Sequence, residues 1–140
     1  MSIIDSFERA FLRMHERGWE KIYILVDIHD TIFEASYHNE ETYKWFPYAK
    51  ETLALLSQRK DISLILWTSS YPDAIKKYLE VFKENGIFFS MINLNSETEE
   101  TDLSDFSEKT YFNVGLDDKF GFDATKDWKE LYNYLKEKGN

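Results

Sequence analysis

Residues 22–31, which read IYILVDIHDT, are the most informative segment for the fold of the chain. The segment opens with five consecutive apolar residues, four of which are β-branched or aromatic. Such a run predicts a strand that is buried on both faces, as the strands of a parallel sheet are. Asp27, His29 and Asp30 follow the run at once. The expected strand therefore places acidic and imidazole side chains at its carboxyl end.

The apolar pattern returns three times, and helical patterns lie between the returns. Further strands are expected at residues 62–67, 87–94 and 111–116, and helices at residues 3–17, 48–59, 73–85 and 126–138. Strands that alternate with helices predict an α/β domain with right-handed crossovers. The expected architecture is a three-layer Rossmann-like sandwich around a central, mainly parallel sheet. Residues 32–46 do not fit the alternation and are expected to form a small flap after the first strand.

Length and composition indicate one folded domain. A chain of 140 residues that is 43% apolar and 17% aromatic can bury one hydrophobic core and is not a disordered polymer. No linker divides it, so residues 1–140 are expected to form a single domain with an N-terminal helix within residues 1–20. The sequence has no cysteine, which excludes disulfides, thiolate metal sites and cysteine-based phosphatase chemistry.

Charge and hydropathy exclude two classes of partner. Lys and Arg number 17 against 26 Asp and Glu, which gives a net charge of −9, so general coating of nucleic acids is not expected. No stretch reaches the ~18 consecutive apolar residues of a membrane helix, and the acidic residues within residues 1–20 argue against a signal peptide. We therefore expect a cytoplasmic protein with no membrane partner, and the oligomeric state is left open.

Reactive side chains follow three of the predicted strands. The first strand is followed by Asp27, the second by Thr68-Ser69-Ser70, and the fourth, which Lys109 precedes, by Asp117-Asp118 and then Asp123. Ligands of open parallel sheets bind beyond the carboxyl ends of the strands. These groups are therefore expected to converge on one edge of the sheet.

The expected cluster has a chemical logic. Clustered carboxylates repel one another and stay ionised at low cost only when a cation sits among them. A hard divalent ion that prefers oxygen ligands, Mg²⁺ above all, suits the carboxylates. A hydroxyl group and a lysine supply donors for an anionic group such as a phosphoryl. An aspartate that faces the phosphorus can attack it and form an aspartyl-phosphate.

These residues resemble the motifs of the haloacid dehalogenase-like (HAD) superfamily of aspartate-nucleophile phosphotransferases. The resemblance extends over residues 21–135 and consists of four motifs in order. They are an apolar strand followed by Asp27-Ile28-His29-Asp30-Thr31, an apolar strand ending in Thr68-Ser69-Ser70, Lys109 shortly before the last strand, and the acidic pair Asp117-Asp118 that closes it.

The resemblance implies a role for each matching residue. Asp27 is then the nucleophile and a metal ligand, Thr68 and Ser69 bind the phosphoryl group, and Lys109 neutralises charge on that group and on Asp27. Asp118 supplies the second metal carboxylate and Asp117 supports the water shell or Lys109, although the sequence leaves the choice between these two aspartates open. Lys76 and Lys77 are rivals for the lysine role but are expected to face solvent from their helix.

His29 is the departure from the superfamily pattern. Superfamily phosphatases carry an aspartate two residues after the nucleophile as general acid and base, and they also bind the metal there through the backbone carbonyl. Any residue provides that carbonyl, so His29 remains an expected Mg²⁺ ligand. A histidine with a pKa near ~6.5 can also transfer protons near neutrality. General acid–base catalysis is worth ~10²–10⁴-fold, so a poorly placed His29 would leave a slow enzyme.

The sequence thus predicts a Mg²⁺-dependent phosphatase that acts through an aspartyl-phosphate on Asp27. Neither gap between motifs has room for a separate cap domain, so the chain resembles a minimal, cap-less member. Its expected partner is a phosphorylated substrate, either a small molecule or a macromolecular end. The alternative, which His29 supports, is a catalytically weak or inactive phosphate- or metal-binding interaction module.

Two other nucleotide or phosphate chemistries are disfavoured by the order of the residues. In a response-regulator receiver domain, which also gathers aspartates around Mg²⁺, the acidic pair follows the first strand, whereas here it comes late. The five glycines form neither a dinucleotide fingerprint nor a P-loop.

Overall fold

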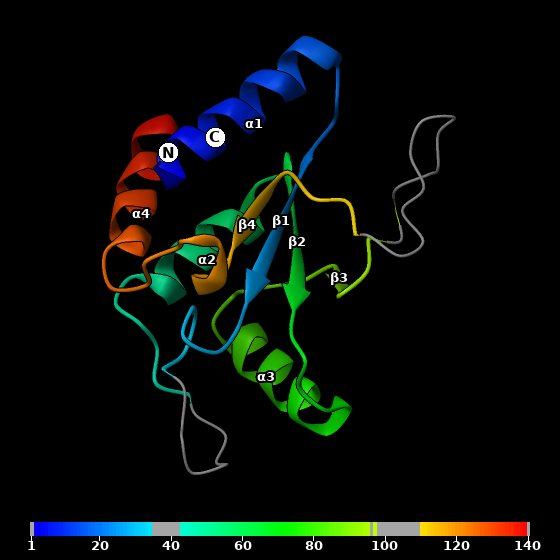
Figure 1. The fold of residues 1–140 in the computed structure, drawn as a ribbon, viewed down its shortest axis with the longest axis vertical. Coiled ribbons are helices and arrows are strands. Elements are labelled where there is room, and N and C mark those ends of the chain that lie inside the picture. Colours follow the sequence, from blue (N-terminus) through cyan, green and yellow to red (C-terminus); the bar gives the residue numbers. More distant parts are fainter. Residues whose placement is uncertain (1, 35–42, 96, 98–109, 140) are drawn as a thin grey trace.

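A parallel sheet of four strands forms the centre of the molecule. The computed structural model describes residues 2–34, 43–95, 97 and 110–139. Its strands are β1 (Ile22–Asp27), β2 (Ile62–Trp67), β3 (Met91–Ile92) and β4 (Val114–Leu116), and they lie in the order β3-β2-β1-β4 (Figure 1). All three pairings are parallel. Together with the flanking helices they confirm the predicted α/β Rossmann-like three-layer fold.

Within the described residues, four α-helices and one short 3₁₀ helix accompany the strands. They are α1 (Ile3–Arg17), α2 (Ala49–Gln58), α3 (Pro72–Glu84), η1 (Asp118–Phe120) and α4 (Asp127–Lys138). The ends of α1 follow from the sequence. Ser2 and Asp5 form a reciprocal capping box at its start, and Gly18 ends it in the left-handed conformation. Pro72 begins α3, where its missing N–H has no intrahelical partner to lose. None of these helices is both long and apolar enough to cross a bilayer.

The third and fourth strands are shorter than the apolar runs predict. Residues 87–89 precede β3 without pairing in the sheet, because Ile87 donates its N–H to Phe82 at the end of α3 and Phe88 donates to the Ser57 hydroxyl. Ser90 donates its N–H to the Leu64 carbonyl of β2 and leads into the strand. Before β4, the Asn113 side chain accepts the N–H of Tyr23 at 2.7 Å, in place of a main-chain carbonyl. Side-chain acceptors and helix-end hydrogen bonds therefore replace the outer rungs of both strands.

The two faces of the sheet carry cores of very different size. Ile22, Ile24 and Val26 of β1 belong to a large core that includes buried residues from all four α-helices. Leu25 lies on the other face in a small second core with Ile65 and Met91. No helical residue among those described belongs to this second core. Since strand side chains alternate between faces, Asp27 at the end of β1 lies on the side of the small core.

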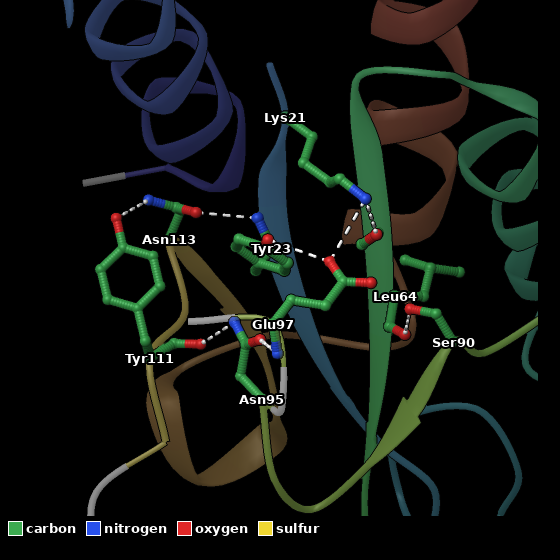
Figure 2. A network of polar contacts seen from close by, with 9 residues as sticks. Lys21, Tyr23, Leu64, Ser90, Asn95, Glu97, Tyr111 and Asn113 are labelled. Carbon is green, nitrogen blue, oxygen red and sulfur yellow. Dashed lines mark hydrogen bonds and ion pairs between the residues drawn. The ribbon is translucent and has the colours of Figure 1, made fainter. Parts of the chain in front are cut away.

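A polar network covers the amino end of that same face (Figure 2). Glu97 accepts hydrogen bonds from the Tyr23 hydroxyl at 3.0 Å and from the Lys21 ammonium at 3.2 Å. Lys21 also contacts the Ser63 hydroxyl at 3.4 Å. The side-chain amide of Asn113 donates a hydrogen bond to the Tyr111 hydroxyl oxygen at 3.2 Å. At the amino ends of the strands, the donors of this network are thus paired with acceptors, and the Lys21 ammonium is paired with a carboxylate.

The predicted flap has a defined base. The main chains of residues 32–34 and 44–46 lie antiparallel, with Glu34 donating to Lys44 and Phe46 donating to Ile32. Trp45 packs edge-on against Phe33 at a centroid distance of 4.7 Å, which joins the base to the main core. The rest of the predicted flap, residues 35–42, lies outside the described residues.

Candidate active site

An open cleft of about 760 Å³ lies where the strands end. Its walls come from the residues that follow each of the four strands, and they include six of the seven predicted site residues: Asp27, His29, Thr68, Ser69, Asp117 and Asp118. Sheet order explains the convergence. β1 lies between β2 and β4, so Asp27 has the second strand's hydroxyl groups on one side and the acidic pair on the other.

Three aspartates form the acidic centre of the cleft. One carboxylate oxygen of each of Asp27, Asp117 and Asp118 lies within 4.8 Å of the others. The parallel register produces this proximity, because Val26 pairs with Leu116 and the next residues along the two strands are Asp27 and Asp117. Asp117 is buried and Asp118 is exposed. The two candidates for the second metal carboxylate thus reach the same point from different environments.

The crowding of these carboxylates changes their ionisation. Burial is the largest cause that raises the pKa of Asp27 to about 7, and the nearby Asp117 carboxylate adds to the shift. A hydrogen bond from Thr31 acts in the opposite direction. Burial also raises the pKa of Asp117, with Asp118 adding to the shift against the opposing hydrogen bond from the Lys119 amide. Ionising the cluster without a cation is therefore costly.

Thr31 connects the two halves of the acidic centre. Its buried hydroxyl donates to Asp27 Oδ2 at 3.2 Å and accepts the Asp118 N–H at 3.2 Å. Its carbonyl accepts a 2.7 Å hydrogen bond from the indole of Trp128, a fully buried residue of α4. The turn after β1 is thereby fixed to both the acidic pair and the helical layer.

The second strand delivers a positioned hydroxyl group. Thr68 Oγ1 lies 2.9 Å from Ser70 Oγ and accepts the Ser70 N–H at 3.1 Å. The main chain of Thr68 is held by Asn93, whose amide accepts the Thr68 N–H at 2.8 Å and donates to its carbonyl at 2.9 Å. Asn93 adopts a positive φ of 59° to make this pair of contacts. Thr68 is therefore held through its backbone while its side chain lines the cleft.

His29 lies on the same cleft with one ring nitrogen engaged. His29 Nε2 is 3.1 Å from the hydroxyl of Tyr78, a residue of α3 that is only 1% exposed, and the two rings meet edge-on. The imidazole ring itself is exposed. This contact fixes the ring orientation, leaving Nδ1 as the atom through which His29 could exchange a proton with a ligand.

Three lysine predictions have different outcomes. Lys109 lies outside the described residues, so its predicted role stays a prediction, although its neighbour Thr110 lines the cleft. Lys76 and Lys77 are exposed on α3, as expected. Lys119, which was not among the candidates, lines the cleft and lowers the pKa of Asp117 through its charge.

Asp123 does not join the acidic cluster among the described residues. It instead accepts hydrogen bonds from the amide and hydroxyl of Thr125, at 3.0 and 2.6 Å. Those bonds lower its pKa, as expected for a carboxylate that stabilises the turn before α4.

Sequence reasoning missed three residues that shape the site, Tyr78, Asn93 and Lys119, and it placed Thr31 in the first motif without giving it a role. Lys119 directly follows the predicted acidic pair, which was the available signal. Tyr78 and Asn93 carry no local signal. Their roles depend on the packing of α3 against the turn after β1 and on the conformation after β3.

The donor set suits a hard divalent cation. All three clustered side chains offer carboxylate oxygens, the ligands that Mg²⁺ prefers. Asp27 and Asp117 have raised pKa values, so a cation placed among them would relieve a repulsion that the protein otherwise bears. The residues present therefore fit a Mg²⁺ ion.

Comparisons with known proteins bear on the fold. No protein-family model matches the chain, and no curated protein matches it. Among solved structures, the chain is similar to a conserved protein from Bacteroides thetaiotaomicron, with 29% sequence identity and a TM-score of 0.64. The match covers 86% of this chain and 93% of that protein. This likeness extends over nearly all of both proteins and supports the α/β architecture.

Proposed function

We propose that the protein is a Mg²⁺-dependent phosphatase of the HAD-like type that acts through an aspartyl-phosphate on Asp27. The observation that carries the proposal is the convergence of Asp27, Asp117 and Asp118 within 4.8 Å, on a cleft that Thr68 also lines. The nucleophile, the anionic ligand set and a hydroxyl donor come from three strands. Their meeting at one edge supports the resemblance seen in the four motifs.

In the first step, Asp27 attacks the phosphorus of a phosphate monoester. The carboxylate forms an O–P bond, and the bond from phosphorus to the alcohol oxygen breaks. The Thr31 hydroxyl donates to Oδ2, so it orients the carboxylate for attack by Oδ1. Thr68 donates a hydrogen bond to the transferring phosphoryl group, whose negative charge is stabilised by donors placed in advance.

His29 moves the protons in this scheme. Its Nε2–H donates to the Tyr78 hydroxyl oxygen, and its Nδ1–H protonates the departing alcohol oxygen. In the second step, Nδ1 accepts a proton from the water that attacks the aspartyl-phosphate. The O–P bond to Asp27 then breaks, inorganic phosphate leaves, and both the carboxylate and the protonated imidazole are restored.

Mg²⁺ would be held by Asp27, by the Asp117–Asp118 pair and by the His29 carbonyl. When bound, it supplies positive charge that keeps Asp27 ionised and neutralises charge on the phosphoryl group.

A non-catalytic phosphate- or metal-binding module is the second candidate. Its support is His29, which stands where superfamily phosphatases carry aspartate and whose Nε2 is already engaged by Tyr78. Such a module would retain the acidic cluster and the cleft but would not release phosphate.

One assay separates the two candidates. Release of 4-nitrophenol from 4-nitrophenyl phosphate is measured with and without Mg²⁺ for the wild type, Asp27→Asn and His29→Asp. We expect Mg²⁺-dependent turnover in the wild type and a loss of at least about 10³-fold in Asp27→Asn, because its amide cannot act as the nucleophile. Glu137→Gln, an isosteric loss of one charge on the exposed face of α4, is the matched control and should retain full activity.

The phosphatase is rejected, and the binding module supported, by a wild type that is no faster than Asp27→Asn together with a His29→Asp variant that gains activity.

A further inference from the structure

Large apolar side chains surround the acidic centre although they are open to solvent. Nine large hydrophobic residues are exposed among the residues described, and three of them line this cleft: Trp67 at 36%, Leu94 at 50% and Phe120 at 56% exposure. Isolated exposed hydrophobic residues are ordinary, whereas several around one concave site indicate a ligand surface. We call Trp67, Leu94 and Phe120 the apolar rim; they share the cleft with the acidic centre and with other polar residues.

Sheet geometry places this rim on both sides of Asp27. Trp67 pairs with Asp27 in the register of β1 and β2, and paired residues of neighbouring strands project to the same face. Phe120 follows β4 on the other side, two residues after Asp118. Leu94 follows β3 beyond Trp67. A group attached to a phosphate at Asp27 would therefore leave the acidic centre between apolar side chains.

The position of Phe120 is built into β4. Its ring lies over Gly115, where an added Cβ would be 2.7 Å from Phe120 Cδ2 and 2.9 Å from Cε2. Phe112 stacks on the ring in a nearly parallel arrangement, with an interplanar angle of 3° and a centroid distance of 6.2 Å. Only a residue without a side chain leaves room for this packing. The exposed ring is therefore a supported platform and not a loosely placed side chain.

The apolar rim does not contribute to binding the phosphate itself. A phosphoryl group is satisfied by charges and hydrogen-bond donors, whereas Trp67, Leu94 and Phe120 gain free energy only by removing apolar surface from water. A substrate that covered them would need an apolar portion next to its phosphate.

We propose that the cleft selects phosphate monoesters whose alcohol carries an apolar group of about the size of a phenyl ring, held between Trp67 and Phe120. This inference rests on the proposed function, because it assigns the phosphate to the acidic centre. It names the part of the substrate that the aspartates cannot recognise.

Matched ligands isolate the contribution of the ring. In the presence of Mg²⁺, calorimetry compares the binding of 2-phenylethylphosphonate with that of ethylphosphonate, which are non-hydrolysable and differ by one phenyl group. The wild type should bind the phenyl compound at least about tenfold more tightly, given the apolar area that a ring buries. The corresponding phosphate esters, which have similar leaving groups, should show the same order in kcat/KM.

Three variants locate the effect. Phe120→Ala and Trp67→Ala should each reduce the phenyl preference severalfold. Gly115→Ala should do the same by displacing Phe120 without touching a cleft-lining polar group. The matched control is Phe88→Ala, because Phe88 is 60% exposed and does not line the cleft. It should keep the wild-type preference.

The outcomes distinguish this inference from the proposed function. Equal binding of the two phosphonates, or a preference that survives in both Phe120→Ala and Trp67→Ala, overturns the inference even when both esters are hydrolysed. A phenyl preference in binding without hydrolysis of either ester supports the inference and rejects the phosphatase.

Discussion

At the amino end of β1, Lys21 and Tyr23 meet the Glu97 carboxylate, and each polar group has a partner of opposite charge or matching role (Figure 2). At the carboxyl end of the same strand and on the same face, Asp27 meets two further carboxylates. Burial and Glu97 raise the pKa of Tyr23 to about 12, which keeps its hydroxyl neutral and costs nothing near neutral pH. Burial and Asp117 raise the pKa of Asp27 to about 7, which makes its ionised form costly there.

This contrast separates structural from functional polar groups in this fold. The amino-end network is complete without any ligand and explains its own presence through hydrogen bonds. The carboxyl-end cluster is repulsive within the described chain, and a protein retains such an arrangement where an external cation or substrate completes it. Substitutions in the carboxyl-end cluster should therefore affect activity, whereas substitutions in the amino-end network should affect only stability.

After the loss of the nucleophile itself, the largest expected effect comes from the hydroxyl group at the cleft. Thr68→Val should lower kcat/KM for a phosphate monoester by about 10²–10³-fold, the usual loss when one donor to a developing charge is removed. Steady-state kinetics with Mg²⁺ measures it. Thr125→Val, the same substitution at an exposed threonine outside the cleft, should leave kcat/KM unchanged. Equal losses in the two variants would remove Thr68 from the reaction.

The next effect is the pH dependence of stability. Because the pKa of Asp27 is raised in the folded state, the folded protein binds this proton more tightly than the unfolded chain, and its contribution to stability is lost as the pH rises from about 4 to about 7. Asp27→Asn removes that loss. In urea denaturation without divalent cations, the variant should match the wild type near pH 4 and exceed it by about 2 kcal/mol near pH 8, after allowance for solvent screening.

Phe88→Ala is the control for that titration, since Phe88 is 60% exposed and carries no titratable group. It should change stability equally at both pH values. An Asp27→Asn variant that gains nothing between the two pH values would show that the cluster is not under electrostatic strain.

An effect of similar size is expected from Thr31→Val, a nearly isosteric change. It removes the hydroxyl that donates to Asp27 and accepts from Asp118, and should lower the free energy of unfolding by about 1–3 kcal/mol. The pKa of Asp27 should rise further, because the lost hydrogen bond lowers it. Urea denaturation and an NMR titration of the Asp27 carboxyl measure the two changes. A pKa that falls instead would contradict the role given to Thr31.

The smallest effect lies at the amino end. A double-mutant cycle with Tyr23→Phe and Glu97→Gln should give a coupling energy of about 0.5–1 kcal/mol, as is typical of a partly exposed hydrogen bond to a charged group. Chemical denaturation measures the cycle, and turnover should be the same in all four proteins. A loss of activity in either single variant would break the contrast between the two ends.

The sequence predicts the central strands well because their apolar runs are continuous. β1 and β2 lie where residues 22–26 and 62–67 place them. β3 and β4 are shorter than predicted, since hydropathy does not reveal that Phe88 bonds to Ser57 or that Asn113 accepts the Tyr23 N–H. Hydrophobic pattern specifies burial, whereas the extent of a strand depends on where each N–H finds its acceptor.

The candidate site divides in the same way. Asp27, Thr68 and the acidic pair could be predicted because each directly follows an apolar run and parallel strands end at one edge. Tyr78 could not, because its contact with His29 spans 49 residues and depends on how α3 packs. The need for glycine at position 115 also could not be predicted, because it depends on how the Phe120 ring packs against β4.

The most direct test of the account is whether the acidic centre binds a divalent cation. Calorimetric titration of Mg²⁺ near neutral pH should show one ion per chain in the wild type, binding about 10–100-fold more weakly in Asp27→Asn and in Asp118→Asn. Glu137→Gln should bind as the wild type does. A wild type that shows no binding at millimolar Mg²⁺, or that binds no better than a variant with all three aspartates replaced by asparagine, would contradict it.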